Sequence, residues 1–162
     1  MSSSDSRVDT NYVKSVPGLI RIVQLVVAIC GLISASSGYY CFNTGGKIHF
    51  YEFTAIYSLI FVILAFILFF FRIDQAIGTR INIPLSLLIN DAILTILYLI
   101  AAILMFVTIG ACNWGVGGRV AAAIFGVLGF LTHGYHAFLD YGWVRGRTSS
   151  QPQPTGNKGD PA

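Results

Sequence analysis

Charged residues are scarce in this chain, at 10% of its 162 residues, whereas hydrophobic residues make up 55%. Soluble domains carry about 25% charged residues, and a water-soluble fold could not bury the apolar surface implied by a mean hydropathy of +0.72. The scarcity therefore excludes a soluble globular domain. The net charge is only +3 and no basic patch stands out, so we expect no nucleic-acid partner.

Motifs for catalysis and cofactor binding are also missing. The sequence contains no Gly-rich phosphate loop, no Cys-x-x-Cys pair and no Ser, His and Asp pattern suited to nucleophilic catalysis. We therefore expect neither enzymatic activity nor a resident cofactor. Residues 1–18 are polar and Ser-rich, and no cleavage site follows them, so the first apolar run is expected to stay as a membrane helix.

What the chain does contain is four long apolar segments. A hydrocarbon core about 30 Å thick needs roughly 20 apolar residues in a helix, and each segment meets that length. Only helices and closed barrels span lipid, and these runs are continuous rather than alternating. We predict an all-α integral membrane protein, a four-transmembrane-helix bundle over residues 19–140. Its helices are expected at about 19–40, 51–71, 84–110 and 120–139, with a cytoplasmic tail at 1–18 and a disordered cytoplasmic tail at 141–162.

The basic residues are distributed unequally between the two sides of these segments. The positive-inside rule places the side richer in Lys and Arg in the cytosol. This predicts that both termini and the middle connection are cytoplasmic, leaving only Lys47 and Arg119 on the other side. The residues on the cytoplasmic side are Arg7, Lys14, Arg21, Arg72, Arg80, Arg145, Arg147 and Lys158.

Several polar residues interrupt the apolar segments at one depth. With the predicted topology, the first segment places Arg21 and Gln24 near its cytoplasmic end, and Asp91 lies about 10 Å into the third. An ionisable group at that depth is costly unless it faces the interior and has a partner. Asn90 lies on a different helical face. We predict a structural polar cluster, buried in the bundle, of Arg21, Gln24, Asp91, His133 and His136.

Two other uses of these residues stay open. Helical spacing would let His133, His136 and Asp140 bind a metal ion, but two histidines without a nearby Cys or Glu are a weak signal. Asp140 is also expected at the water boundary, so we predict no metal site. Alternatively, Asp91 and the two histidines would move protons or ions in a small oligomeric transporter or channel. The almost purely apolar outer halves of the first, third and fourth segments argue against this, although Glu52 could act as an outer station.

Small residues recur at helical spacing in two of the segments. Such residues let helix backbones approach closely, which is how membrane helices pack. The second segment is Phe-rich, so we expect much of its surface to face lipid. The predicted packing residues are Ala28, Gly31, Ala35 and Gly38 in the first segment, and Ala122 and Gly126 in the fourth.

Two of the three cysteines fall in the short outer loops. Cys41 and Cys112 would either form a disulfide, since that side is oxidising, or remain two free thiols. Sequence spacing does not decide between these, because a disulfide requires a short Cα–Cα distance. Cys30 lies within the first segment and is expected to be a small packing residue.

The end of the fourth segment carries residues typical of a membrane boundary. Tyr141 and Trp143 are expected to be interfacial anchors, while Arg145 and Arg147 favour anionic lipid. The spacing of Leu139, Tyr141 and Arg145 also fits a weak pattern proposed for cholesterol contact. The same pattern recurs in the polar N-terminal tail, which shows how readily it arises.

Three stretches carry a family resemblance: Gly18–Val26, Asn90–Ala102 and Ala121–Gly126. Over about Val16–Tyr141 the chain resembles the MARVEL domain, particularly its CKLF-like, MAL and plasmolipin members. In that family the first helix carries an Arg/Gln pair and the third an Asp, which fall here on Arg21, Gln24 and Asp91. The first outer loop is too short to resemble occludin or the synaptophysins.

The resemblance implies a role in vesicle trafficking, membrane apposition, sorting to lipid-ordered domains or escort of other membrane proteins, without catalysis. It implies residence in the plasma membrane or in endosomal and secretory vesicles. The expected partners are membrane lipids, whether sterol-rich or anionic, other membrane proteins and further copies of the chain.

Overall fold

The computed structural model describes residues 10–38, 43–71 and 82–149. Within these ranges every regular element is a helix, which confirms the all-α prediction. A short helix comes first and four long ones follow. They are α1 (Thr10–Lys14), α2 (Val16–Ser36), α3 (Gly45–Phe70), α5 (Ile83–Ile109) and α6 (Val116–Ser149).

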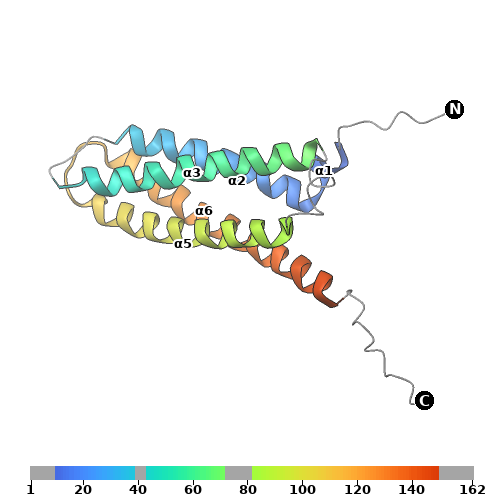
Figure 1. Cartoon of the computed structure of the whole chain (residues 1–162). Coiled ribbons are helices and arrows are strands. Elements are labelled where there is room, and N and C mark those ends of the chain that lie inside the picture. Colours follow the sequence, from blue (N-terminus) through green and yellow to red (C-terminus); the bar gives the residue numbers. More distant parts are fainter. Residues whose placement is uncertain (1–9, 39–42, 72–81, 150–162) are drawn as a thin grey trace, which may run out of the picture.

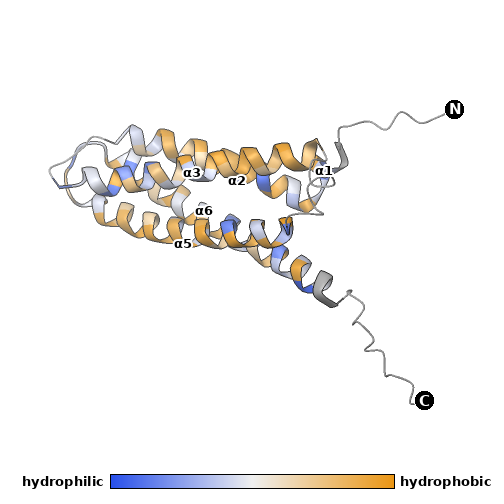
Figure 2. Cartoon of the chain, viewed as in Figure 1, coloured by the Kyte–Doolittle hydropathy of each residue, from blue (hydrophilic) through white to orange (hydrophobic). Residues whose placement is uncertain are grey.

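The four long helices are each long and apolar enough to cross a membrane. Figure 2 shows that hydrophobic residues dominate all of them along most of their length, and that hydrophilic residues are concentrated at a few positions. The prediction of a four-helix integral membrane protein is therefore confirmed.

The long helices form a ring of four around a shared interior. α2 packs against α3 and α6, and α5 packs against the same two neighbours, so α2 and α5 lie on opposite sides of the ring. α1, the start of α5 and the ends of α3 and α6 all lie at one end of the bundle, here called the terminal end (Figure 1). The other end is called the opposite end.

The helix boundaries differ from those predicted. α2 ends at Ser36, short of the predicted residue 40, and residues 39–42 lie outside the described ranges. α3 starts at Gly45 rather than at residue 51. Apolar runs mark only the part of a helix that lies in hydrocarbon, whereas the backbone continues helical through polar residues that suit a helix.

α6 shows the largest difference from the prediction. It continues to Ser149, ten residues beyond the predicted end at residue 139. No proline interrupts this stretch, so nothing in it breaks the hydrogen-bond ladder. The predicted disorder is therefore wrong for residues 141–149, and the remainder of that tail lies outside the described residues.

A compact cap starts α2 and holds α1 against it. The Ser15 side chain accepts a hydrogen bond from the Gly18 backbone N–H (3.3 Å) and donates one to the Tyr12 carbonyl (2.6 Å). A Cβ atom on Gly18 would overlap the carbonyl oxygen of Tyr12, so only glycine permits this approach. The Tyr12 ring stacks on Phe69 of α3, with ring centroids 4.9 Å apart. The N-terminal helix is thereby joined to two helices of the bundle.

Small residues line the places where the long helices come closest. The six residues predicted for helix packing are all buried. A Cβ on Gly31 would overlap the Tyr51 hydroxyl, and one on Gly126 would lie 3.0 Å from the Ala102 side chain. α2, α3, α5 and α6 therefore approach so closely at these points that larger side chains would not fit.

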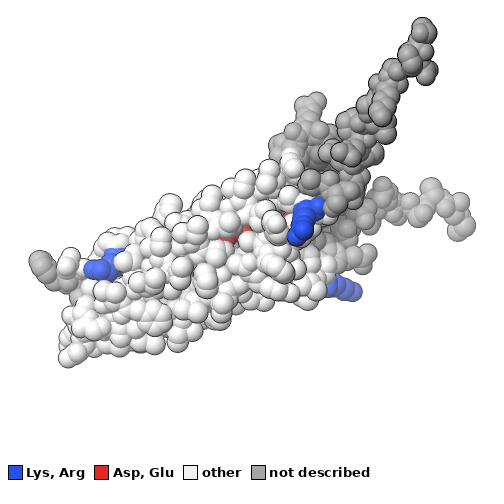
Figure 3. All heavy atoms as spheres, turned by 90° about the horizontal axis from the view of Figure 1, so that it is seen from below, with Lys and Arg blue, Asp and Glu red and all other residues white. Residues whose placement is uncertain are grey.

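The outer surface of the bundle is apolar over the middle of its length. Large aliphatic side chains such as Ile33, Leu64 and Val107 are more than half exposed. In Figure 3 the Lys and Arg side chains lie at the two ends of the body, and mostly uncharged residues cover the surface between them. This arrangement matches a hydrocarbon layer bounded by water on both sides.

Candidate functional site

A buried ion pair joins opposite sides of the ring. Arg21 of α2 donates two hydrogen bonds to Asp91 of α5, from Nη1 to Oδ1 (3.0 Å) and from Nη2 to Oδ2 (2.7 Å). Both side chains have 0% exposure. Nη1 also donates to Gln24 Oε1 (2.9 Å), and the guanidinium lies 5.1 Å from the centre of the Phe61 ring. The two-point geometry fixes the Asp91 carboxylate in one orientation.

Two histidines of α6 approach the same carboxylate. His133 Nδ1 lies 2.7 Å from Asp91 Oδ1, and its Nε2 lies 2.9 Å from Ser58 Oγ of α3. His136 Nδ1 lies 3.2 Å from Asp91 Oδ2 and 3.1 Å from Asp140 Oδ2. Both rings are almost completely buried, at 1% and 3% exposure.

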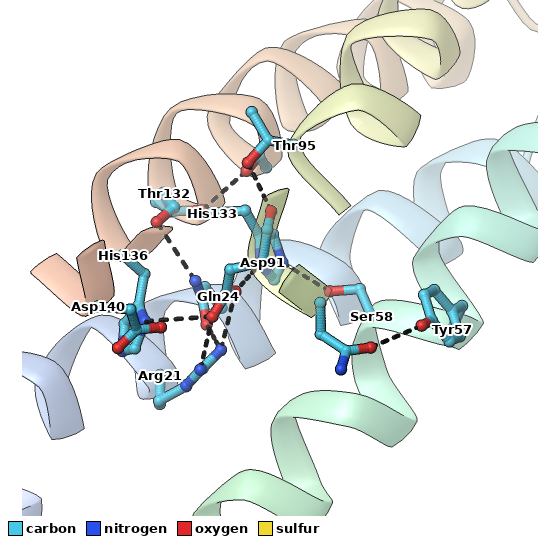
Figure 4. Close-up of polar contacts among 12 residues, drawn as sticks. Arg21, Gln24, Tyr57, Ser58, Asp91, Thr95, Thr132, His133, His136 and Asp140 are labelled. Carbon is cyan, nitrogen blue, oxygen red and sulfur yellow. Dashed lines mark hydrogen bonds and ion pairs between the residues drawn. The ribbon is translucent and has the colours of Figure 1, made fainter. Parts of the chain in front are cut away.

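The structure thus brings together all five residues predicted for the polar cluster (Figure 4). Gln24 completes the contact to α6 by donating from Nε2 to the Thr132 carbonyl (3.3 Å). With Ser58 included, every one of the four long helices contributes a side chain. We use "polar cluster" below for these seven residues: Arg21, Gln24, Ser58, Asp91, His133, His136 and Asp140.

Two members of the polar cluster were missed or misplaced by sequence reasoning. Asp140 was expected at the water boundary, but it is 5% exposed and bonds to His136, because α6 stays packed against the bundle at this point. Ser58 lies in the Phe-rich segment expected to face lipid largely, yet it is fully buried. The polar pair Tyr57 and Ser58 within that apolar run was the available signal.

A second polar contact links α3 and α5 outside the polar cluster. The Tyr57 hydroxyl donates to Asn90 Oδ1 (2.9 Å), and Asn90 Nδ2 donates to the Ser86 carbonyl (3.0 Å). Adjacent residues Asn90 and Asp91 therefore serve different neighbours, as their different helical faces require.

Metal binding was one alternative for these residues. Potential ligand atoms of Asp91, His136 and Asp140 lie within 4.8 Å of one another. However, Arg21 already occupies both oxygens of Asp91, so its guanidinium would stand beside any cation and repel it. His133, which the sequence hypothesis included, is not in that group. The arrangement favours a hydrogen-bonded ion network, and we identify no metal ligands in it.

Transport was the other alternative. A run of hydrogen bonds and one ion pair, between His136 and Asp91, extends from Asp140 through His136, Asp91 and His133 to Ser58. Beyond it, the described core toward the opposite end is formed largely by alanines with Met105, Ile48 and Tyr51. Glu52, the suggested outer station, bonds instead to Ser36 Oγ (3.2 Å) and His49 Nδ1 (3.1 Å). In the described ranges, no further hydrogen bond connects the run that ends at Ser58 with Glu52 and its neighbours.

At the opposite end a buried arginine organises the loop before α6. Arg119 has 0% exposure, donates from Nη2 to the Cys112 carbonyl (2.6 Å), and places Nη1 3.3 Å from Cys112 Sγ. Sequence reasoning treated Arg119 only as a charge on the outer side. Cys112 is disulfide-bonded and Cys30 is a free thiol. Cys41, the partner considered for Cys112, lies outside the described residues.

The expected interfacial residues lie on the last part of α6. Tyr141 and Trp143 are 54% and 40% exposed, and Arg145 is exposed. The Trp143 ring lies 6.4 Å from the Phe69 ring, which links α6 to α3. The side chain of Arg147 lies outside the described part.

The chain matches the model of a known family. The model of the membrane-associating domain called MARVEL matches residues 12–139. This range covers most of the chain and every member of the polar cluster except Asp140. No solved structure matches the chain.

Proposed function

Because this chain belongs to the MARVEL family of membrane-associating domains, we propose that it organises membranes from within the bilayer rather than catalysing a reaction. The roles are the arrangement of membrane domains, vesicle trafficking or membrane apposition, and escort of partner membrane proteins. One observation supports this most: buried polar side chains bond to one another, while large apolar side chains face outward along every long helix. The surface left for function is the one that meets lipid and other membrane helices.

The orientation in the membrane is proposed from the distribution of Lys and Arg. The positive-inside bias favours cytoplasmic termini, which would put the polar cluster in the cytoplasmic leaflet. Tyr141, Trp143 and the basic residues beside them would then meet anionic headgroups. We propose residence in the plasma membrane or in endosomal and secretory vesicles, with lipids, other membrane proteins and further copies of the chain as partners.

The test is quantitative proteomics of surface and vesicle membranes from cells with and without the protein. Loss of the protein should reduce the delivery of a defined set of membrane proteins, and expression of the wild-type protein should restore that delivery. Ile96 faces outward at 58% exposure, so Ile96→Ser changes the outer surface while Ile96→Leu is the matched control. Rescue by the control but not by the Ser variant is expected. Unchanged membrane proteomes after loss of the protein would reject the organising role.

A small oligomeric ion or proton transporter is the second candidate. The polar run from Asp140 to Ser58 favours it, because ionisable groups inside a membrane domain can relay protons. Flux in proteoliposomes of wild type, compared with Asp91→Asn, separates the two functions. Flux that disappears in the variant would establish transport, and absence of flux from folded wild-type protein would eliminate it.

A further inference from the structure

We propose that the polar cluster binds one additional proton, that His136 carries it, and that this proton fastens the terminal end of α6 to α5. Such a proton would sit on the polar cluster whether the protein organises membranes or transports ions.

Charged groups face His136 from α2, α5 and α6. α2 supplies Arg21, α5 supplies Asp91, and α6 supplies Asp140 and His133. From α3 the described neighbour in the polar cluster is the neutral Ser58. From α1, Tyr12 lies close enough to feel Arg21 and Asp140, but burial raises the pKa of its phenol, so it stays uncharged.

The position of His136 Nδ1 requires a hydrogen on that atom. It lies between Asp91 Oδ2 (3.2 Å) and Asp140 Oδ2 (3.1 Å). Arg21 donates to both oxygens of Asp91, so this carboxylate is the ionised, accepting partner. A bare nitrogen lone pair facing that oxygen would be repelled, whereas an N–H between two carboxylates is attracted to both.

His133 needs no extra proton. Its Nδ1 donates to Asp91 Oδ1 (2.7 Å), and its Nε2 can accept the hydroxyl hydrogen of Ser58 (2.9 Å). The neutral ring thus satisfies both of its nitrogen atoms. The two histidines of α6, one turn apart, therefore have different requirements.

The formal charges of the polar cluster do not balance without one more proton. Arg21 contributes one positive charge, whereas Asp91 and Asp140 contribute two negative charges, which leaves one negative charge unbalanced inside a membrane domain. Such a charge is expensive to bury. A proton on His136 Nε2, a buried atom without a hydrogen-bond partner among the described residues, makes the sum zero. A divalent metal ion would exceed the balance and would stand beside Arg21.

Loss of this proton should loosen the terminal end. Without it, Asp91 and Asp140 face each other across a neutral ring, and the attraction between α5 and α6 weakens. Because the proton is bound by the folded state, its stabilising effect is present at acidic pH and is lost as pH rises through the point of release. Rising pH should therefore lower the thermal stability of the bundle.

The direct test is ¹⁵N NMR of histidine-labelled full-length protein in phosphatidylcholine nanodiscs, titrated from about pH 5.5 to about pH 8.5, where histidines usually titrate. His49, whose side chain is 67% exposed and lies outside the polar cluster, gives the third histidine signal. We expect His136 to show two protonated nitrogens at a pH where His133 shows one. His136→Gln and His133→Gln assign the signals. A His136 ring with a single protonated nitrogen throughout the range would overturn the proposal.

A matched pair of variants tests the charge count. Asp140→Asn removes one negative charge, so His136 should become neutral near pH 7. The Tm of this variant should therefore no longer decrease as pH rises. His49→Gln should keep the wild-type fall in Tm. An Asp140→Asn protein with undiminished pH dependence would contradict the proposal. So would Zn²⁺ that raises Tm in wild type but not in Asp140→Asn, since that result would make the group a metal site. If Asp140→Asn does not fold, the wild-type NMR spectrum alone decides.

Discussion

Arg21 and Asp91 form a two-point ion pair between α2 and α5, the two helices on opposite sides of the ring. A second contact, between Ser58 of α3 and His133 of α6, crosses the other diagonal. The two meet because His133 also bonds to Asp91. The Asp91 carboxylate therefore connects helices that make few direct contacts with each other. The other contacts that hold the bundle together lie between neighbouring helices of the ring.

Breaking the diagonal ion pair should strongly destabilise the bundle. Asp91→Leu leaves the guanidinium of Arg21 buried without its counterion, and such a loss typically costs about 3–5 kcal/mol. We expect an unfolding free energy reduced by about that amount in detergent-denaturation experiments, and retention of the variant in the endoplasmic reticulum of cells. Wild-type delivery and stability of Asp91→Leu would contradict the structural role.

The double variant Arg21→Leu with Asp91→Leu serves as the control for that experiment. Replacing a buried ion pair with apolar residues is often close to neutral. We therefore expect the double variant to recover much of the loss caused by Asp91→Leu alone. A double variant whose loss of stability equals the sum of the two single losses would show that the two charges act independently.

Gly129 should not tolerate a side chain. A Cβ at this position would lie 2.6 Å from the Tyr98 ring, which itself stacks on His133 with ring centroids 5.5 Å apart. Gly129→Ala should lower the unfolding free energy by about 1–3 kcal/mol through overpacking. Gly142→Ala on the same helix meets nothing within 4 Å and should stabilise by up to about 1 kcal/mol. Equal effects of the two variants in a denaturation series would refute this packing.

Gly18 controls the attachment of α1. Gly18→Ala would push Cβ into the Tyr12 carbonyl, so α1 should separate from α2 and the stacking of Tyr12 on Phe69 should be lost. Limited proteolysis should then cut the first 15 residues faster than in wild type. Gly46→Ala, which meets nothing within 4 Å, is the matched control. An unchanged cleavage rate in Gly18→Ala would argue against the close approach.

The cysteines give a prediction that a gel can check. Cys112 is disulfide-bonded, and we propose Cys41 as its partner. Reduction should shift the mobility of wild type and of Cys30→Ser, but not of Cys41→Ser or Cys112→Ser. A reducible shift that persists in Cys41→Ser would exclude this pairing.

The sequence was sufficient for the four helices because each apolar run is long enough to span lipid. It was insufficient for their ends, since Gly45–Phe50 and Tyr141–Ser149 are helical without being apolar runs. These stretches can form helix because no proline interrupts their backbone hydrogen bonds. Hydropathy does not measure that property.

The same contrast holds for the polar cluster. Arg21, Asp91 and the histidines stand out because an ionisable residue in an apolar run needs a partner. Ser58, with Tyr57 beside it, gives only a weak signal, since a hydroxyl can bond within its own helix. Its role depends on which helices lie diagonally across the ring, and that order is a property of the tertiary packing. The burial of Asp140 likewise depends on how far α6 remains against α5.

The length of α6 sets the distance between the polar cluster and the end of that helix. From Asp140 to Ser149 the helix advances about 14 Å at 1.5 Å per residue. This helical stretch separates Ser149 from the polar cluster by that distance. Tyr141, Trp143 and Arg145 lie on this stretch, so a partner that binds near Ser149 would lie beside these exposed residues, and a shift of α6 at the polar cluster would be passed along the helix to it. Changes among a few buried side chains would in this way change the position of the end of α6.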